Sequence, residues 1–214
     1  AMFCSEVWGD SHWADAHIQL PEWTDYRADF CMLNGRVYPD TVAPNAPING
    51  AASVHSLAVQ RTAEGDLVAP PGNDHLQYQP LSALVTCRAG ERVLLRFANL
   101  GFREAAMTLA GIKMKVVGKD ATPMKGRDGT DTSYEASTVS FGAGESIDAI
   151  FTAPPHSGGS GPDVYVLYDR SYERSNNLAA EGSVQYGGRR TEVRVYPSNF
   201  ALAAQQYPND HGGV

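Results

Sequence analysis

Several kinds of segment are missing from this 214-residue sequence, and each absence narrows what the chain can do. No run approaches the roughly 18 apolar residues that a membrane-spanning helix needs, so we expect no membrane partner. The first residues lack the basic stretch followed by an apolar one that marks a signal peptide. Because the start is abrupt, we expect a piece of a longer chain, whose targeting signals would lie elsewhere.

Charged residues are also few, at 19%, and the formal net charge is −7. An acidic chain repels the phosphates of nucleic acids and of anionic lipids, so we expect no nucleic-acid partner. Hydrophobic residues make up 43% of the chain, which is enough for a packed core and argues against disorder.

Short motifs for metal, nucleotide or hydrolytic chemistry are absent as well. The three cysteines, Cys4, Cys31 and Cys87, form no C-x-x-C pair, which argues against zinc and thioredoxin-like sites. No nucleophile elbow, phosphate-binding loop or N-glycosylation sequon occurs. Cys31 and Cys87 lie in strand-like sequence, and two interpretations stay open: a disulfide, or two small buried apolar side chains.

The residues that are present predict strands. Helical periodicity is scarce, while 21 glycines and 13 prolines interrupt the sequence at short intervals. Three segments alternate apolar and polar residues, with Val93, Leu95 and Phe97, then Ile112, Met114 and Val116, then Ile147, Ala149 and Phe151 on the apolar faces. Segments 163–170 and 191–197 complete the set, and 94–120 is predicted to be two strands meeting at a loop. We therefore expect an all-β chain, with antiparallel sheets packed as a Greek-key β-sandwich or barrel.

Three stretches look irregular instead. Residues 1–27 are rich in Trp, Asp and His, and residues 39–80 hold many prolines with one predicted strand at 53–60. Residues 197–214 are predicted to be a linker, or a short helix with a frayed end.

Five motifs, in order, resemble those of the multicopper oxidases. They are FCMLNGRVYPDT, CRAGERVLLRFANLG, LAGIKMKVVGKD, VSFGAGESIDAIFTAP and YVLYDRSYERSNN. The set resembles the middle, second cupredoxin-like domain of a three-domain oxidase, and SEVWGDSHWADAHIQ resembles the segment that joins the first domain to it. The resemblance therefore implies an inter-domain linker at 1–27, a cupredoxin-like domain at 28–196 and a C-terminal tail or linker at 197–214.

The copper ligands of that family have no counterpart here. A type 1 copper site needs two imidazoles, a thiolate and usually a weak axial ligand, and no cysteine has a following histidine and methionine at the family's spacing. The H-x-H pairs of the trinuclear centre are absent among the six histidines, and AAMTLAG stands where a copper-bearing domain carries such a pair. We therefore expect no catalytic, cofactor-binding or metal-binding residue in this chain, with copper in the parent protein.

The resemblance also implies a role. The parent would couple oxidation of a substrate to reduction of dioxygen to water, in the periplasm or outside the cell. This chain would be a spacer between flanking cupredoxin domains, inactive alone, with homo-oligomerisation left open. One alternative is a β-sandwich binding module for carbohydrate or protein. Another is a standalone cupredoxin that binds metal near His12 and His17.

The segment DSHWADAH offers donor atoms for such a metal, from Asp10, His12, Asp15 and His17. The two histidines are five residues apart, which suits neither one helix face nor one strand face. The spacing therefore favours polar linker residues over a metal site.

Other polar groupings have structural explanations beside functional ones. Asp128 and Asp131 could hold calcium, but their spacing favours a solvated hairpin turn. Arg96, flanked by apolar residues, is predicted to pair with a carboxylate such as Asp148. Tyr165, Tyr168, Tyr172 and Tyr186 are either a stacking platform or side chains divided between core and surface.

Overall fold

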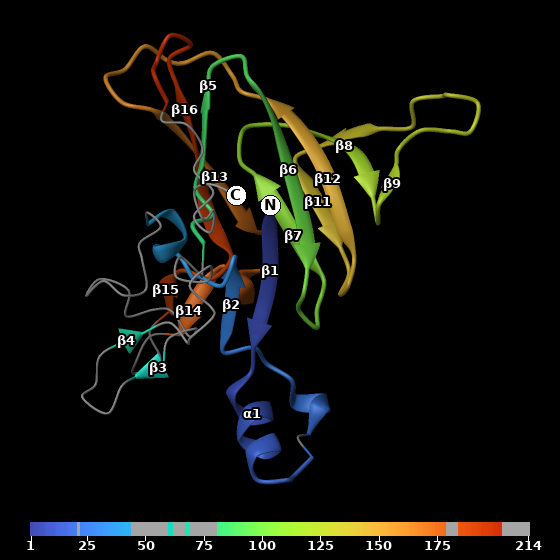
Figure 1. Cartoon of the computed structure of the whole chain (residues 1–214), viewed down its shortest axis with the longest axis vertical. Coiled ribbons are helices and arrows are strands. Elements are labelled where there is room, and N and C mark those ends of the chain that lie inside the picture. Colours follow the sequence, from blue (N-terminus) through green and yellow to red (C-terminus); the bar gives the residue numbers. More distant parts are fainter. Residues whose placement is uncertain (21, 44–59, 62–66, 69–80, 179–183, 203–214) are drawn as a thin grey trace.

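The computed structural model describes residues 1–20, 22–43, 60–61, 67–68, 81–178 and 184–202. Two β-sheets face each other (Figure 1). The residues between the first two strands, 8–20 and 22–29, form a lobe that projects from the lower end of the sheets and contains the helix α1 (Gly9–Ala16). The remaining helical turns are η1 (Trp23–Asp25), η2 (Asp40–Val42) and η4 (Tyr172–Arg174). Within the described ranges, no helix combines the length and apolar character needed to cross a membrane.

The first sheet has seven strands, in the order β10-β8-β12-β6-β1-β2, with β9 added beside β8. Their bounds are β10 (Tyr134–Ala136), β8 (Met114–Lys119), β12 (Ser146–Thr152), β6 (Arg92–Asn99), β1 (Met2–Val7), β2 (Phe30–Leu33) and β9 (Thr122–Pro123). The second sheet has five strands, in the order β11-β7-β13-β16-β5. Their bounds are β11 (Thr138–Phe141), β7 (Ala105–Leu109), β13 (Asp163–Asp169), β16 (Arg190–Tyr196) and β5 (Val85–Arg88).

Two short hairpins lie outside these sheets. They are β3 (Gln60–Arg61) with β4 (Leu67–Val68), and β14 (Asn176–Leu178) with β15 (Val184–Tyr186). The predicted all-β sandwich is confirmed, but its sheets are mixed rather than antiparallel. Strand β1 runs parallel to β6, and β16 runs parallel to β5. The Greek-key connectivity stays a prediction.

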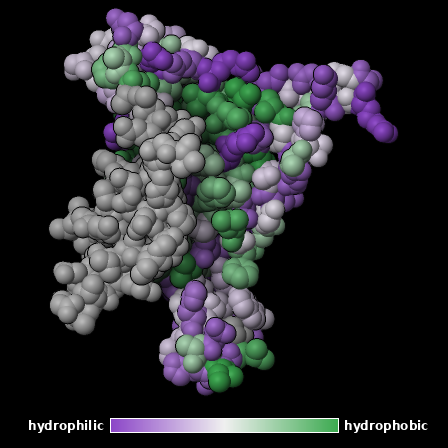
Figure 2. All heavy atoms as spheres, in the orientation of Figure 1, coloured by the Kyte–Doolittle hydropathy of each residue, from purple (hydrophilic) through white to green (hydrophobic). Residues whose placement is uncertain are grey.

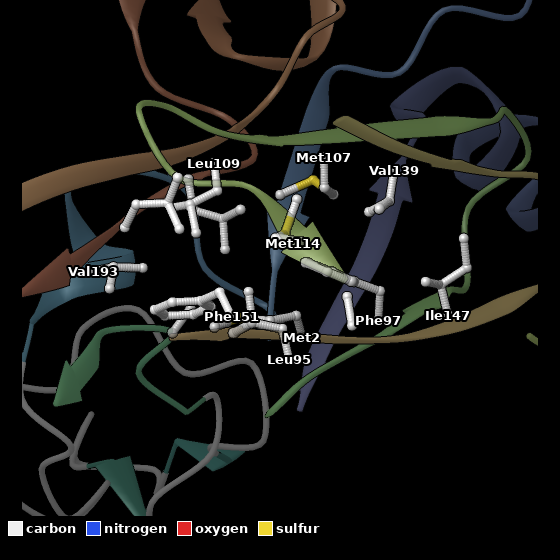
Figure 3. Close-up of a cluster of buried hydrophobic side chains, with 14 of the residues drawn as sticks. Met2, Leu95, Phe97, Met107, Leu109, Met114, Val139, Ile147, Phe151 and Val193 are labelled. Carbon is white, nitrogen blue, oxygen red and sulfur yellow. The ribbon is translucent and has the colours of Figure 1, made fainter. Parts of the chain in front are cut away.

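The core lies between the two sheets, where apolar side chains from both point toward one another (Figure 3). The alternation in the sequence locates it correctly: Phe97, Met114, Val116, Ile147 and Phe151 are all buried. Burying one such side chain stabilises the fold by about 1.5–3 kcal/mol, so the sandwich is held mainly by this layer.

The stretch 94–120 holds three strands rather than the two that its pattern predicts. Strand β6 ends at Asn99, β7 crosses to the opposite sheet, and β8 returns to pair with β12. Gly111, with φ +80°, makes the turn between β7 and β8 in a conformation that side chains rarely adopt. A change of sheet leaves no mark on the alternation, which is why the sequence alone merges the strands.

The segment 1–27 also differs from the irregular stretch expected there, while its assignment as an inter-domain linker stays a prediction. Strand β1 is inserted between β6 and β2, and its Met2 and Cys4 are buried in the core. The sandwich therefore begins near Met2, and only the residues after β1 leave it. The strand predicted at 53–60 lies outside the described residues except for Gln60, and residues 203–214 lie outside them too.

Candidate functional site

Strand β7 carries the AAMTL residues that, by the motif resemblance, are expected where a copper-bearing domain has an H-x-H pair. Its Ala105, Met107 and Leu109 are fully buried in the core, and the hydroxyls of Thr108 and Thr138 are hydrogen-bonded at 2.8 Å. These side chains offer no imidazole or thiolate, the ligands that copper prefers. This part of the sandwich therefore serves packing.

The three cysteines are free and buried. Cys31 lies on β2 of the first sheet and Cys87 on β5 of the second, so the interpretation as small buried apolar residues holds and the disulfide does not. Burial raises the pKa of Cys4 to about 12 and the pKa of Cys31 and of Cys87 to about 11. Thiols with such pKa values stay protonated at neutral pH, which makes them poor nucleophiles and poor metal ligands.

The four donors of DSHWADAH lie on α1 and its C-terminal cap. His17 Nδ1 lies 2.7 Å from the carbonyl of Trp13, and its ring stacks on the Trp13 ring with centroids 4.2 Å apart. Across the part of the chain that the structure describes, no three His, Cys, Asp or Glu side chains gather into a metal-holding group. These four side chains therefore do not converge on one point.

Asp128 and Asp131 serve the turn between β9 and β10 instead of a shared cation. Asp128 accepts hydrogen bonds from the backbone and hydroxyl of Thr130, and Asp131 accepts the same pair from Ser133. The hydrogen bonds from Ser133 hold the pKa of Asp131 below its usual range. Each carboxylate thus closes its own local turn, as the solvated-hairpin interpretation expects.

The other two groupings both have structural explanations. Arg96 and Asp148 face each other across β6 and β12, with Nε 3.5 Å from Oδ1, so the predicted pair is confirmed. Tyr165 and Tyr168 are three residues apart on β13, so they point to opposite faces of the sheet. Tyr172 is exposed on η4, and the side chain of Tyr186 lies outside the described part. The tyrosines of β13 therefore form no single platform.

A buried group of charged side chains, absent from the expectations above, joins the lobe to the sandwich. The Arg189 side chain is 0% exposed and lies between the carboxylates of Glu6, which is 1% exposed, and Asp169, which is 0% exposed. Its guanidinium donates to Glu6 Oε1 at 2.8 Å, to Asp169 Oδ2 at 3.1 Å and to the Ser5 carbonyl at 3.3 Å. We call Arg189, Glu6 and Asp169 the buried triad.

Hydrogen bonds from other segments complete the environment of the two carboxylates. Glu6 Oε2 accepts from the Tyr26 hydroxyl at 2.7 Å and from the Phe102 backbone at 3.0 Å. Burial alone would raise the pKa of Glu6, but the Tyr26 hydrogen bond and the Arg189 charge outweigh it, so the net pKa is lowered. Asp169 Oδ1 accepts from the Ser171 backbone at 3.0 Å. The triad therefore links β1, the end of β13, the residue before β16 and the lobe.

An aromatic cluster covers the Glu6 end of this group. Trp8 and Tyr26 are buried, and Trp23 and Phe102 complete the cluster with ring centroids 5.2 Å apart. Trp8 contacts Tyr26 edge to face at 5.4 Å, and the Arg103 guanidinium lies 5.5 Å from the centroid of the Tyr26 ring. Phe102 is nevertheless 65% exposed, so the cluster is covered on one side only.

Exposed apolar side chains concentrate on the same part of the molecule. Nine of the thirteen large hydrophobic residues exposed in the described ranges lie in the lobe, on β1, β2 and β6, or on the turn after β6. We call these nine the N-terminal face: Phe3, Trp13, Ile18, Leu20, Trp23, Phe30, Leu94, Leu100 and Phe102. Ile18 and Leu20 are each 97% exposed, and Figure 2 shows strongly hydrophobic atoms at the tip of the lobe. Apolar surface gathered in this way is typical of an interaction site.

Comparison with known proteins agrees with this geometry at the level of fold. No family model and no curated protein matches the sequence. The structure resembles a blue copper oxidase from Nitrosomonas europaea, with a TM-score of 0.56 and 17% identity over 91% of this chain and 42% of that one. It resembles the multicopper oxidase mgLAC with a TM-score of 0.55 and 21% identity over the same shares. It also resembles a copper-containing nitrite reductase (NirK) from Thermus scotoductus SA-01, with a TM-score of 0.50 and 13% identity over 92% of this chain and 30% of that one.

These similarities establish the class of fold. The chain is an all-β sandwich of the cupredoxin-like type, and the resemblance to multicopper oxidases expected from its motifs is confirmed in three dimensions. The chain spans less than half the length of these solved structures.

Proposed function

We propose that this chain is the middle, second cupredoxin-like domain of a multicopper oxidase, that it binds no copper, and that it acts as a spacer between flanking cupredoxin domains. The observation that carries the proposal is the composition of β7, which sits in the cupredoxin-like fold but presents only packed apolar and hydroxyl side chains. The relative lengths support the proposal, because the structural match covers 91% of this chain but only 42% of each oxidase chain.

The N-terminal face supports the partners named in this proposal. A spacer must present fixed apolar surfaces to its neighbours, and the N-terminal face mixes five aromatic side chains with the aliphatic side chains of Ile18, Leu20, Leu94 and Leu100, a composition that suits a protein interface. A carbohydrate site would instead present aromatic rings bordered by polar groups, without exposed aliphatic side chains of this kind. The face therefore favours flanking domains over the alternative of a carbohydrate-binding module.

Copper, when present in the parent, would supply the electron transfer that couples substrate oxidation to reduction of dioxygen to water. The residues of this chain would contribute geometry. The packed sandwich, with its lobe anchored by the buried triad, would hold the flanking domains at a constant separation. A periplasmic or extracellular location of the parent is part of the proposal.

The first test is the copper content of the purified chain after incubation with copper and dialysis, measured together with its visible spectrum. We expect no stoichiometric copper and no blue thiolate-to-copper band. One tightly held copper per chain would overturn the proposal. Replacing both His12 and His17 with alanine would then show whether the lobe holds that copper.

The second test addresses the spacer role in the full-length parent. Phe30→Glu places a charge on the N-terminal face, while Val164→Glu makes the same change on β13, where the side chain is also about half exposed. We expect F30E to lower oxidase activity and copper-site occupancy in the parent, with V164E close to wild type. Equal effects of the two variants, with the isolated chain folded in both cases, would refute the assigned interface.

A further inference from the structure

The outer face of the first sheet, next to Leu94 of the N-terminal face, carries a feature that the spacer role does not use. The outer face of the first sheet is hollowed over β8, β12 and the start of β6, forming a cavity of about 450 Å³. Its lining includes Arg92, Lys113, Lys115, Glu135, Val117 and Ile150. We call it the cationic hollow. Figure 1 shows β6, β12 and β8 side by side in this sheet.

The strand register explains how these side chains come together. Arg92 faces Thr152 across β6 and β12, and Ile150 lies between Leu94 on β6 and Lys115 on β8. The pairing of β12 with β8 shifts register between Asp148 and Ala149, an irregularity that bends the sheet. Cations from three separate segments thus line one depression: Arg92 from the start of β6, Lys113 from the turn after β7, and Lys115 from β8.

The charges in the cationic hollow are only partly neutralised. Lys115 Nζ is paired with Asp131 Oδ2 at 3.0 Å. Within the residues that the structure describes, neither Arg92 nor Lys113 has an ion-pair partner. Glu135 is the one acidic residue in the lining. With the Lys115–Asp131 pair neutral and Glu135 set against the two unpaired cations, the hollow keeps an excess of one positive charge, on a chain whose formal net charge is −7.

A neighbouring hollow on the same sheet provides an internal comparison. It has a volume of about 340 Å³ and is lined by Arg96, Lys119 and Asp148 among others. There Arg96 lies 3.5 Å from Asp148, and Lys119 Nζ lies 3.3 Å from Glu145. Both of its cations are neutralised by carboxylates of the protein, so this second hollow has no excess positive charge to offer a ligand.

We propose that the cationic hollow binds a small organic anion, an apolar body that carries one carboxylate or phosphate group. Arg92 and Lys113 would take the anionic group, because charged hydrogen bonds to a carboxylate or phosphate are the strongest that side chains make. The half-buried side chains of Val117 and Ile150 would contact the apolar body. The volume falls within the range of about 300–1,000 Å³ that is typical of small-molecule sites. This inference is independent of the proposed spacer role.

The probe for a test is benzoate, titrated into the isotopically labelled chain while backbone amide chemical shifts are recorded by NMR. The salt concentration is about 0.15 M, which screens the attraction between benzoate and distant exposed charges. We expect saturable shifts centred on Lys113, Lys115 and Thr152. Benzyl alcohol, which has a similar body without the charge, should bind at least about fivefold more weakly, as loss of charged hydrogen bonds predicts. Inorganic phosphate should compete with benzoate.

Two double variants with the same change in charge make the test specific. Arg92→Gln with Lys113→Gln removes the unpaired cations of the cationic hollow, and Arg96→Gln with Lys119→Gln removes the carboxylate-paired cations of the second hollow. We expect the first pair to weaken benzoate binding at least about fivefold and the second pair to leave it within about twofold, since only the first cations would touch the ligand. The amide spectra of both report that the sandwich is intact.

The outcomes that would overturn the inference are equally definite. Equal weakening by the two double variants would mean that general charge attracts the probe. Equal binding of benzyl alcohol, or shifts that do not saturate, would mean that there is no anion site. The copper and interface tests of the spacer role involve none of these residues, so the two proposals succeed or fail separately.

Discussion

Replacing Arg189 with methionine is the sharpest test of how the lobe is held to the sandwich. Methionine keeps much of the side-chain length and apolar contact but removes the charge that lies between Glu6 and Asp169. Both carboxylates would stay buried, at 1% and 0% exposure. Glu6 would keep the Arg174 guanidinium at 3.7 Å, while Asp169 would keep only its hydrogen-bond donors. Removing one member of a buried ion pair in this way costs about 3–5 kcal/mol of folding free energy.

The expected loss of folding free energy is large relative to the total stability of a domain. A domain is typically stable by about 5–15 kcal/mol, so Arg189→Met should remove at least about a fifth of the total. With a urea dependence of about 2 kcal/mol per molar, the midpoint of unfolding should fall by about 2 M. The assay is urea unfolding followed by tryptophan fluorescence. It also reports on the lobe, because all three tryptophans lie in its segment, at Trp8, Trp13 and Trp23.

A matched control separates the buried triad from charge pairs in general. Arg96→Met removes the same kind of side chain from its pair with Asp148, whose two side chains are 64% and 37% exposed. Solvent screens such a pair, so the expected cost is about 0–1 kcal/mol. If Arg189→Met costs no more than Arg96→Met, the reasoning is refuted. Adding Glu6→Gln and Asp169→Asn to Arg189→Met should recover part of the stability, because the stranded charges are then gone.

Three further predictions follow from the same interior. The folded-state pKa of Glu6 is lowered, so its stabilising contribution is present above its unfolded pKa of about 4.3 and is lost as pH falls through the folded value. The acid unfolding curve of Glu6→Gln should therefore be flatter than that of the wild type, and an unchanged curve would contradict this. The three buried thiols should resist a thiol reagent at pH 8 in the native chain and react within seconds in urea; fast native labelling would contradict their burial. Gly101→Ala should destabilise the fold by about 1–3 kcal/mol, because the new Cβ would lie 2.8 Å from Glu6 Cδ and 2.9 Å from Arg189 Nη2. As a control, Gly161→Ala adds a Cβ with no atom within 4 Å and should leave the urea midpoint nearly unchanged.

Local pattern was a sound guide to the strands and to the chain's class. The alternation around Phe97, Met114 and Ile147 identified core positions correctly, because side chains on opposite faces of a strand need opposite chemistry when one face is buried. The pairing of Arg96 with Asp148 was also readable, as a polar residue in an apolar strand that needs a partner. Pairing across a sheet is a local consequence of register.

Two expectations failed for a shared reason. The stretch 94–120 was merged into two strands, and residues 1–27 were expected to be irregular although β1 lies inside the first sheet. In both cases the deciding event is a long-range choice of partner strand. A six-residue strand such as Met2–Val7 carries little signal by itself, and its parallel pairing with β6 joins residues more than ninety positions apart.

By itself, the sequence determined that this protein is a β-sandwich related in pattern to multicopper oxidases, without their copper-binding H-x-H pairs. Alternation, turn residues and the presence or absence of ligand side chains are properties of short stretches, which a sequence states directly. Only the tertiary structure decided that Glu6 and Asp169 share one buried arginine, that apolar side chains gather on the N-terminal face, and that Arg92 and Lys113 meet over one hollow. Those features depend on which distant strands become neighbours, and that choice comes from packing the whole chain around one core.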